Sequence, residues 1–421
     1  MTDQHPDFPT GPTSDPTSRR PWPTDRVSAP NTSGQTTGDG TSVFPPVPPG
    51  TQVPYGPPPD AQMPYGPPPG APVPYGPPPG APVPYGPPAA KPWVDPMPAP
   101  GTEYHRFLAT PRNRWWKGVL AILGFVLGYL IINAVVGGIA IGIDVATGRM
   151  TLESIATGAV EFTPALFLAT NIGNALSIPL AMFLQWLVWR QPVRWLHSVA
   201  GVVRWRLFGR TALIVVPIWI VYMVVSAFAF PEVSGTDGTG GNYTSETVAL
   251  LIIMLLTTPL QAAGEEYGAR GLIMRSAGSW VASPVPGLII ATLVPSFVFM
   301  LAHGAGDPWL NVYYFFFGVM MSILAWRTGG LEAACVVHVV NNMMAFGITI
   351  AAGQEIDLDR SAGTGGAFML LPMAVLAVVT AVLWLLSNRS KVQRRYQPGI
   401  GSPLPTDPAT VLPGPGGHFT R

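Results

Sequence analysis

The chain has 421 residues, of which 48% are apolar and only 11% are charged, whereas a soluble domain usually carries about 25% charged residues. This shortage of charge argues against a soluble enzyme and favours a protein that exposes its side chains to lipid. The net charge of +1 argues against a nucleic-acid binder, which needs a basic surface. A single cysteine, Cys335, excludes an intrachain disulfide framework.

Residues 1–104 form a segment rich in Pro, Gly and Tyr, with a ten-residue repeat that resembles PYGPPPGAPV. Such a segment cannot bury enough apolar surface to offset its ordering entropy, so we expect a disordered tail of polyproline II character. It serves either as a solvated spacer or as a docking strip for a proline-recognising partner. Residues 391–421 are also rich in Pro and Gly, and we expect a second disordered tail there.

Residues 105–390 contain eight apolar runs of about the length that crosses a bilayer, whose hydrocarbon layer is about 30 Å thick. Backbone polar groups in lipid must be satisfied within each segment, which favours helices. The sequence therefore predicts an all-α fold, a polytopic transmembrane helical bundle of about eight spans. The runs lie near Trp116–Ile143, Pro164–Trp189, Thr211–Phe230, Thr247–Ala263, Val285–Ala302, Trp309–Ala325, Leu331–Ile350 and Ala367–Ser387.

The charges between these runs alternate in sign along the chain. Basic residues precede the first run and follow the second, fourth, sixth and eighth, and they include Arg114, Lys117, Arg190, Arg206, Arg210, Arg275, Arg327, Arg389 and Lys391. The other loops are mainly acidic, with Arg149 and Arg360 as their basic residues. Basic loops stay in the cytoplasm during insertion. The pattern predicts an integral plasma-membrane protein of many passes with both termini in the cytoplasm.

Three polar clusters interrupt the apolar runs, where an ionisable side chain costs several kcal/mol and marks a functional candidate. They are Gly264–Arg270, which begins Gly-Glu-Glu, then Phe299–His303, and then His338–Asn342. Residues four apart share a helix face, so the second glutamate can pair with the arginine and His338 can lie beside Asn342. The first glutamate is rotated by about 100° and faces elsewhere.

These groups suit the hydrolysis of a peptide bond in a water-filled pocket between helices. A carboxylate in an apolar setting can take a proton from water and later return it to the leaving amine. A histidine can orient that water, or bind a metal that acidifies it. A second histidine and a carboxamide can donate hydrogen bonds to the tetrahedral oxyanion.

Each cluster alone also has a purely structural interpretation. A Glu-Arg pair can fix the register of two helices, and a His or Asn in a membrane helix often only links it to a neighbour. Three such clusters in one domain that has few other intramembrane charges favour a functional site. His105, His197 and His418 lie outside the runs and have no predicted role.

The three clusters resemble the motifs of the CPBP family of intramembrane peptidases, also called the CAAX protease and bacteriocin-processing or Abi family. The family pattern is Glu-Glu-x-x-x-Arg, then Phe-x-x-x-His, then His-x-x-x-Asn. This chain supplies all three in that order, on separate spans, as Glu265-Glu266-x-x-x-Arg270, Phe299-x-x-x-His303 and His338-x-x-x-Asn342. The resemblance covers about residues 247–350.

The resemblance implies a role for each matched residue. Glu265 would activate water with the help of His303, and Arg270 would hold Glu266 as the partner of Glu265. His338 and Asn342 would stabilise the oxyanion. The family is usually labelled a metalloprotease, and in that case Zn²⁺ would be held by Glu265, His303 and His338. A Glu/His water mechanism needs no ion, and the chain lacks the His-Glu-x-x-His helix of soluble zinc peptidases.

Two features of the sequence conflict with this assembly. Gly268 and Gly271 would weaken the helix that carries the first motif. If every run crosses straight through, Glu265 and His303 lie near opposite faces of the membrane. We therefore expect the fifth run to begin deeper than its hydropathy indicates, as a short, tilted or re-entrant segment.

The sequence thus predicts an intramembrane endopeptidase that hydrolyses a peptide bond of a membrane-associated or lipidated protein. One alternative is a non-catalytic binding or immunity protein on the same fold. A transporter is a further alternative, although the spans show no internal repeat of the kind found in transporters.

Overall fold

The computed structural model describes residues 94–158, 161–229, 243–351, 353, 356 and 359–398. Most of both predicted tails, and with them the tyrosine repeat, lies outside the described residues. The helices, in chain order, are η1 (Tyr104–Arg106), α1 (Trp115–Ala146), α2 (Leu152–Thr157), α3 (Pro164–Ala175), α4 (Ser177–Trp189), η2 (Val193–Leu196), α5 (Trp205–Ala229), α7 (Ser245–Glu266), η3 (Tyr267–Ile273), α8 (Met274–Gly278), α9 (Pro284–Ala302), α10 (Pro308–Thr328), α11 (Glu332–Ala351), η4 (Ala367–Met369) and α12 (Leu370–Arg389).

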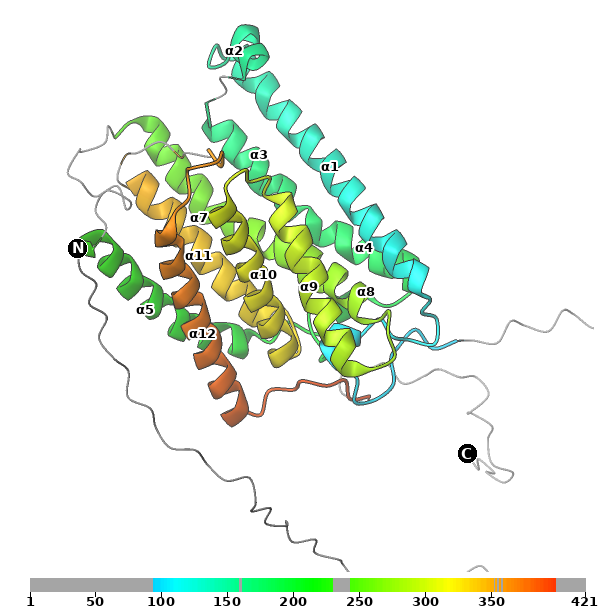
Figure 1. Ribbon diagram of the computed structural model, residues 1–421. Coiled ribbons are helices and arrows are strands. Elements are labelled where there is room, and N and C mark those ends of the chain that lie inside the picture. Colours follow the sequence, from blue (N-terminus) through cyan, green and yellow to red (C-terminus); the bar gives the residue numbers. More distant parts are fainter. Residues whose placement is uncertain are drawn as a thin grey trace, which may run out of the picture. The chain divides into compact units, whose positions relative to one another are not determined.

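The predicted all-α, multi-span architecture is confirmed. The described part of the chain contains eight helical segments that are long and apolar enough to cross a membrane. Extended structure in this part is limited to two isolated β-bridges, Glu103 with Arg395 and Ser198 with Gly330. The chain is therefore a multi-pass membrane protein, and its spans run side by side in a bundle (Figure 1).

Local sequence sets several helix ends. The Thr244 side chain accepts hydrogen bonds from the first turn of α7, and Asp307 accepts them from the first turn of α10 just before Pro308. Such caps satisfy backbone N–H groups that the helix itself leaves unpaired. Helix α10 ends at Gly329, whose φ of 69° lies in the left-handed region that favours glycine.

One predicted span differs greatly from the observed one. The fourth run was expected to end near Ala263, but α7, η3 and α8 continue it without interruption as Ser245–Gly278, a segment of 34 residues. Its middle part, η3, is a π-helix. Gly268 and Gly271, which were expected to weaken the helix, lie in this π-helical part and do not interrupt the span. Gly264 and Gly268 pack closely against neighbouring helices. A Cβ on Gly264 would lie 2.0 Å from the Asn174 carbonyl oxygen, and one on Gly268 would lie 2.1 Å from the Phe125 ring.

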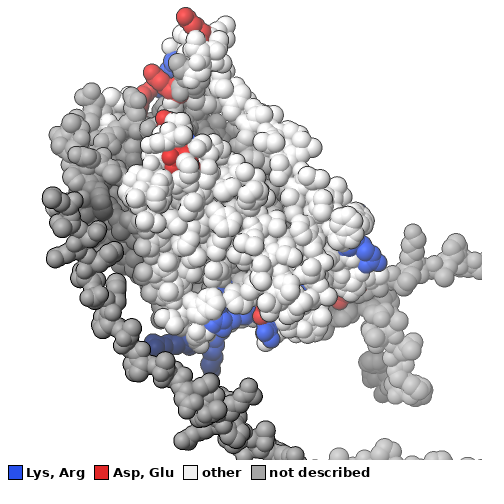
Figure 2. All heavy atoms as spheres, viewed as in Figure 1, with Lys and Arg blue, Asp and Glu red and all other residues white. Residues whose placement is uncertain are grey.

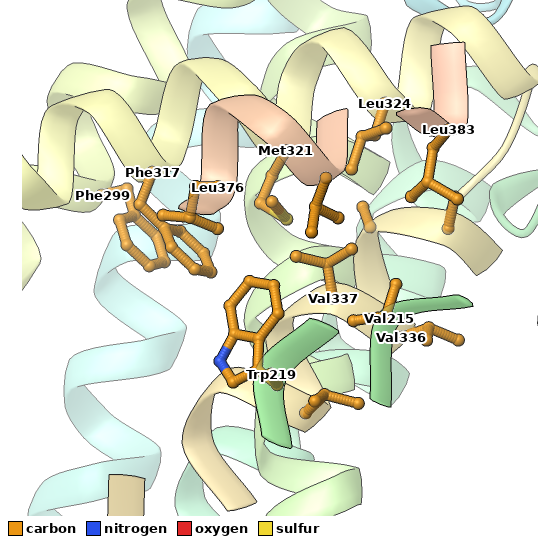
Figure 3. Packing of buried hydrophobic residues seen from close by; sticks show 14 residues of the cluster. Val215, Trp219, Phe299, Phe317, Met321, Leu324, Val336, Val337, Leu376 and Leu383 are labelled. Atoms are coloured by element: carbon orange, nitrogen blue, oxygen red, sulfur yellow. The ribbon is translucent and has the colours of Figure 1, made fainter. Parts of the chain in front are cut away.

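The bundle is organised around α7, which packs against α3 on one side and α11 on the other (Figure 1). Helix α11 also packs against α5, and α10 packs against α9 and α12. The largest apolar cluster fills the space between α5, α10, α11 and α12, with Trp219, Met321 and Val337 near its centre (Figure 3). Phe299 and Phe317 stack at one end of this cluster, and so they connect the apolar core to the polar clusters.

Segments that flank the spans pack onto one end of the bundle. Tyr104 and Phe107 are fully buried before α1, and Tyr396 is buried after α12. The Tyr396 ring meets Phe107 and Trp195 edge-on, with centroids 5.5 Å and 5.3 Å away. The fully buried Arg275 lies over the Tyr104 and Phe107 rings. Packed residues therefore continue beyond residues 105–390 on both sides.

The two ends of the bundle differ in charge. On the face in Figure 2, most basic side chains lie at the end where α12 finishes, and most acidic ones lie at the opposite end, around α2. Successive loops of such a bundle lie at alternate ends, so loops that alternate in charge along the chain give one basic end and one acidic end. We call these the basic end and the acidic end; the cytoplasmic location of the basic end remains a prediction.

Candidate active site

The first motif lies in the interior of the long fourth span. Glu266 and Arg270 are both fully buried, and an Arg270 guanidinium nitrogen lies 3.0 Å from Glu266 Oε1. The other terminal nitrogen of Arg270 donates to the Gly318 carbonyl on α10, at 3.2 Å. The Arg270 guanidinium also covers the Phe299 ring at 4.7 Å. The spacing of the motif predicts the Glu266–Arg270 pair, and the further contacts of Arg270 link this pair to α9 and α10.

His338 on α11 lies between the two adjacent carboxylates. Its Nδ1 is 2.8 Å from Glu266 Oε1, and its Nε2 is 3.6 Å from Glu265 Oε2. Because a carboxylate that is paired with arginine only accepts hydrogen bonds, Nδ1 of His338 carries its hydrogen and donates a hydrogen bond to Glu266. Glu265 keeps 18% of its side chain exposed, whereas Glu266 keeps none. The two neighbouring carboxylates thus have different surroundings, one anchored and one accessible.

His303 is the C-cap residue of α9 and lies within a group of aromatic rings. Its ring stacks on Tyr314 with centroids 3.9 Å apart and lies 4.5 Å from the Phe299 ring. Phe299 is also 5.9 Å from the His338 ring. His303 Nδ1 is 2.8 Å from the Phe299 carbonyl oxygen, which can only accept, so Nδ1 donates and Nε2 of the neutral ring is free to accept a proton.

Asn342 contacts the first motif through Gln261, a residue outside the three motifs. The Asn342 amide donates to Gln261 Oε1 at 3.1 Å, and the Gln261 amide donates to Glu265 Oε1 at 2.5 Å. Tyr313 donates to Asn341 at 3.2 Å, and Asn341 in turn donates to Asn342. Gln261 precedes Glu265 by one helical turn, and its polar side chain inside an apolar run was the available signal.

A loop near the acidic end holds His303 from outside the three motifs. Arg360 donates to the His303 carbonyl at 2.9 Å, and its guanidinium lies 5.7 Å from the Tyr314 ring. The backbone N–H groups of Gly306 and Asp307 donate to the Arg360 carbonyl at 2.8 Å and 3.2 Å. The loop after α11 therefore fixes the end of α9, an arrangement that no local sequence pattern indicates.

The expected displacement of the fifth span is wrong. Helix α9 is continuous over Pro284–Ala302 and begins where hydropathy places it. The three motifs meet because the fourth span is long. At about 1.5 Å per residue, Glu265 lies about 20 Å before the end of α8 and His303 lies about 28 Å after the start of α9. The two helices are joined at the basic end, so both side chains lie in the interior of the bundle, well away from that end.

The motifs contain Glu and His side chains, which are suitable ligands for a metal, but these side chains are not arranged around one common position. Both histidines use Nδ1 for hydrogen bonds, which is the usual orientation for a ligand that binds metal through Nε2. Among the described residues, however, no three His, Cys, Asp or Glu side chains are arranged to hold a metal ion. The predicted Zn²⁺ site at Glu265, His303 and His338 therefore does not fit this conformation of the described residues.

The fold and these side chains define a class of protein: a multi-pass membrane protein with a cluster of carboxylates, imidazoles and carboxamides buried between its helices. Residues 247–344 match the family described as "Type II CAAX prenyl endopeptidase Rce1-like". The match contains all three motifs and confirms the predicted resemblance to CAAX proteases over this segment.

The chain is also similar to "Uncharacterized protein YyaK" of Bacillus subtilis (strain 168), at 28% identity over 105 residues. The alignment covers 24% of this chain and 34% of that protein, so the chain matches about a third of the length of this relative. No solved structure matches the chain significantly.

Proposed function

We propose that this protein is an intramembrane endopeptidase that hydrolyses a peptide bond of a membrane-associated or lipidated protein. The observation that carries the proposal is the contrast between the two adjacent glutamates. Glu266 is fully buried and paired with Arg270, whereas Glu265 is partly exposed and accepts a hydrogen bond from a neutral amide, Gln261. His338 lies between the two carboxylates. Pairs of titratable groups in different environments are typical of acid-base sites. The Rce1-like match over the same residues supports the same reaction class.

In the proposed mechanism, Glu265 takes a proton from a water molecule whose oxygen attacks the carbonyl carbon of the substrate. His303 accepts a hydrogen bond from that water at Nε2, the nitrogen that its own backbone contact leaves free. The carboxamide of Asn342, held beside Glu265 through Gln261, donates to the oxyanion that forms. When the C–N bond breaks, Glu265 returns the proton to the leaving amine.

Glu266, Arg270 and His338 position these groups. Arg270 pairs with Glu266, and Glu266 accepts a hydrogen bond from Nδ1 of His338. His338 is thereby oriented with Nε2 toward Glu265. Loss of any of the three would displace Glu265 without removing the base itself. Zinc content measured together with activity tests whether the hydrolysis requires a metal.

The test is to compare the new peptide N-termini that appear in membranes from cells that express wild-type protein, Glu265→Gln or Glu246→Gln. Glu246 lies on the same helix but is 51% exposed at its far end, where it pairs with Arg149, and so it is the matched control. We expect N-termini that appear with wild type and Glu246→Gln and disappear with Glu265→Gln. Equal sets from all three proteins would contradict the proposal, and so would no new N-termini from wild type, which would favour the binding alternative.

A further inference from the structure

An apolar groove lies between α5 and α12 at the basic end of the bundle, away from the three motifs. It has a volume of about 590 Å³, within the range of about 300–1,000 Å³ that is usual for sites of small ligands. Leu213 and Leu386 form its walls, and both are exposed, at 78% and 38%. Ala333 and Leu383, from the main apolar cluster, are buried below them.

Two arginines lie at the rim of the groove, one on each of the helices that form it. Arg210 on α5 and Arg389 on α12 both line the groove and are both exposed. Neither forms an ion pair with any residue in the described part of the chain, although Arg204, directly before α5, is paired with Glu332. Two cations on opposite walls of one groove, without anionic partners among the described residues, favour an anionic ligand.

The apolar residues continue from the arginines toward the middle of the membrane. Leu213 follows Arg210 by about one helical turn along α5, and Leu386 precedes Arg389 by about one turn along α12, which enters the groove in the opposite direction. A ligand that satisfies both features has an anionic head at the rim and an apolar chain along the groove. In a membrane protein, basic pockets between spans bind the headgroups of anionic lipids.

We propose that the groove between α5 and α12 binds an anionic phospholipid, with its phosphate between Arg210 and Arg389 and one acyl chain along Leu213 and Leu386. This inference is independent of the proposed peptidase activity, because the groove contains none of the motif residues. The bound lipid bridges two helices that otherwise leave an opening at this end of the bundle. It would therefore fasten the last span to the rest of the protein.

The test uses full-length protein in detergent, titrated with phosphatidylglycerol or with phosphatidylcholine of the same acyl chains, and native mass spectrometry to count retained lipids. We expect wild type to retain one phosphatidylglycerol in preference to phosphatidylcholine. The variant Arg210→Gln/Arg389→Gln should lose about five-fold in this preference for each arginine removed. The control Arg114→Gln/Arg206→Gln removes two exposed arginines outside the groove and should leave the preference unchanged.

A second variant separates the headgroup from the acyl chain. Leu386→Trp fills the groove but keeps both arginines, and it should also abolish retention of phosphatidylglycerol. Equal retention of the two lipids by wild type would overturn the proposal. An equal loss of this preference in Arg210→Gln/Arg389→Gln and in the control Arg114→Gln/Arg206→Gln would also overturn it. Such a result would indicate only a general attraction of anionic lipid to the basic end. Competition by inorganic phosphate alone, with retention unaffected by Leu386→Trp, would indicate an anion site instead.

Discussion

Replacement of Arg270 by methionine would test whether the buried ion pair organises the site. Both side chains of the Arg270–Glu266 pair are fully buried, and Glu266 Oε2 has no hydrogen-bond partner among the described residues. Glu266 therefore depends on the contacts of Oε1, with Arg270 and His338. Removal of one partner from such a pair leaves an uncompensated buried charge and costs about 3–5 kcal/mol.

The matching double variant separates charge from packing. In Glu266→Gln/Arg270→Met no charge remains, and replacement of both members of a buried pair is often neutral or stabilising. We expect the double variant to recover most of the stability that Arg270→Met loses, yet to remain inactive because His338 has lost its carboxylate acceptor. Arg149→Met is the control, since it breaks the exposed pair with Glu246 and should cost about 0–1 kcal/mol.

The measurement is reversible unfolding in mixed micelles with increasing SDS. The reasoning would be refuted if Arg270→Met were no less stable than Arg149→Met. It would also be refuted if the double variant were as unstable as the single one, because the cost would then come from lost packing around Phe299 and not from an unpaired charge.

Three further outcomes follow from the contacts around the site. Arg360→Ala should lower kcat about ten-fold or more with little change in KM, because the His303 carbonyl loses its donor and small displacements of a catalytic group are costly. Gly264→Ala should destabilise the fold by about 1–3 kcal/mol, since its Cβ would meet the Asn174 carbonyl oxygen. Burial lowers the pKa of His197 from its usual 6.5, so its contribution to stability falls as pH drops below that value.

Each of these outcomes has its own control. Arg360→Lys keeps the charge and should recover part of the kcat, whereas equal kcat in the alanine variant and wild type would remove Arg360 from the site. Gly209→Ala adds a Cβ with no neighbour within 4 Å and should be neutral; an equal loss at both glycines would contradict the packing argument. Between about pH 7.5 and about pH 5.5, the melting temperature of His197→Gln should fall less than that of wild type. An equal fall in both proteins would contradict the lowered pKa of His197.

Hydropathy and motif spacing were sufficient for the architecture and for much of the site. The eight spans could be predicted because a bilayer imposes a length and an apolar composition on each helix separately. Glu266 and Arg270 could be paired because helical geometry places residues four apart on one face. Both predictions use only residues that are close together in the sequence.

The remaining features depend on contacts between distant segments. The fourth span continues past Ala263, with Gly264 packed closely against Asn174 and Gly268 against Phe125. Hydropathy does not show these contacts, so the end of the apolar run gave the wrong end for the fourth span. That error produced the second one, the expected displacement of the fifth span. The position of Arg360 over the end of α9 depends on a loop without periodicity.

The most direct measurement is the turnover of a peptide identified from the membrane comparison, with purified protein in lipid nanodiscs. General acid-base catalysis contributes about 10²–10⁴ in rate, so we predict that Glu265→Gln lowers kcat by at least about a hundred-fold while Glu246→Gln stays near wild type. Retention of wild-type kcat by Glu265→Gln would contradict the assignment of Glu265 as the base. Failure of purified wild-type protein to cleave that peptide would contradict the peptidase itself.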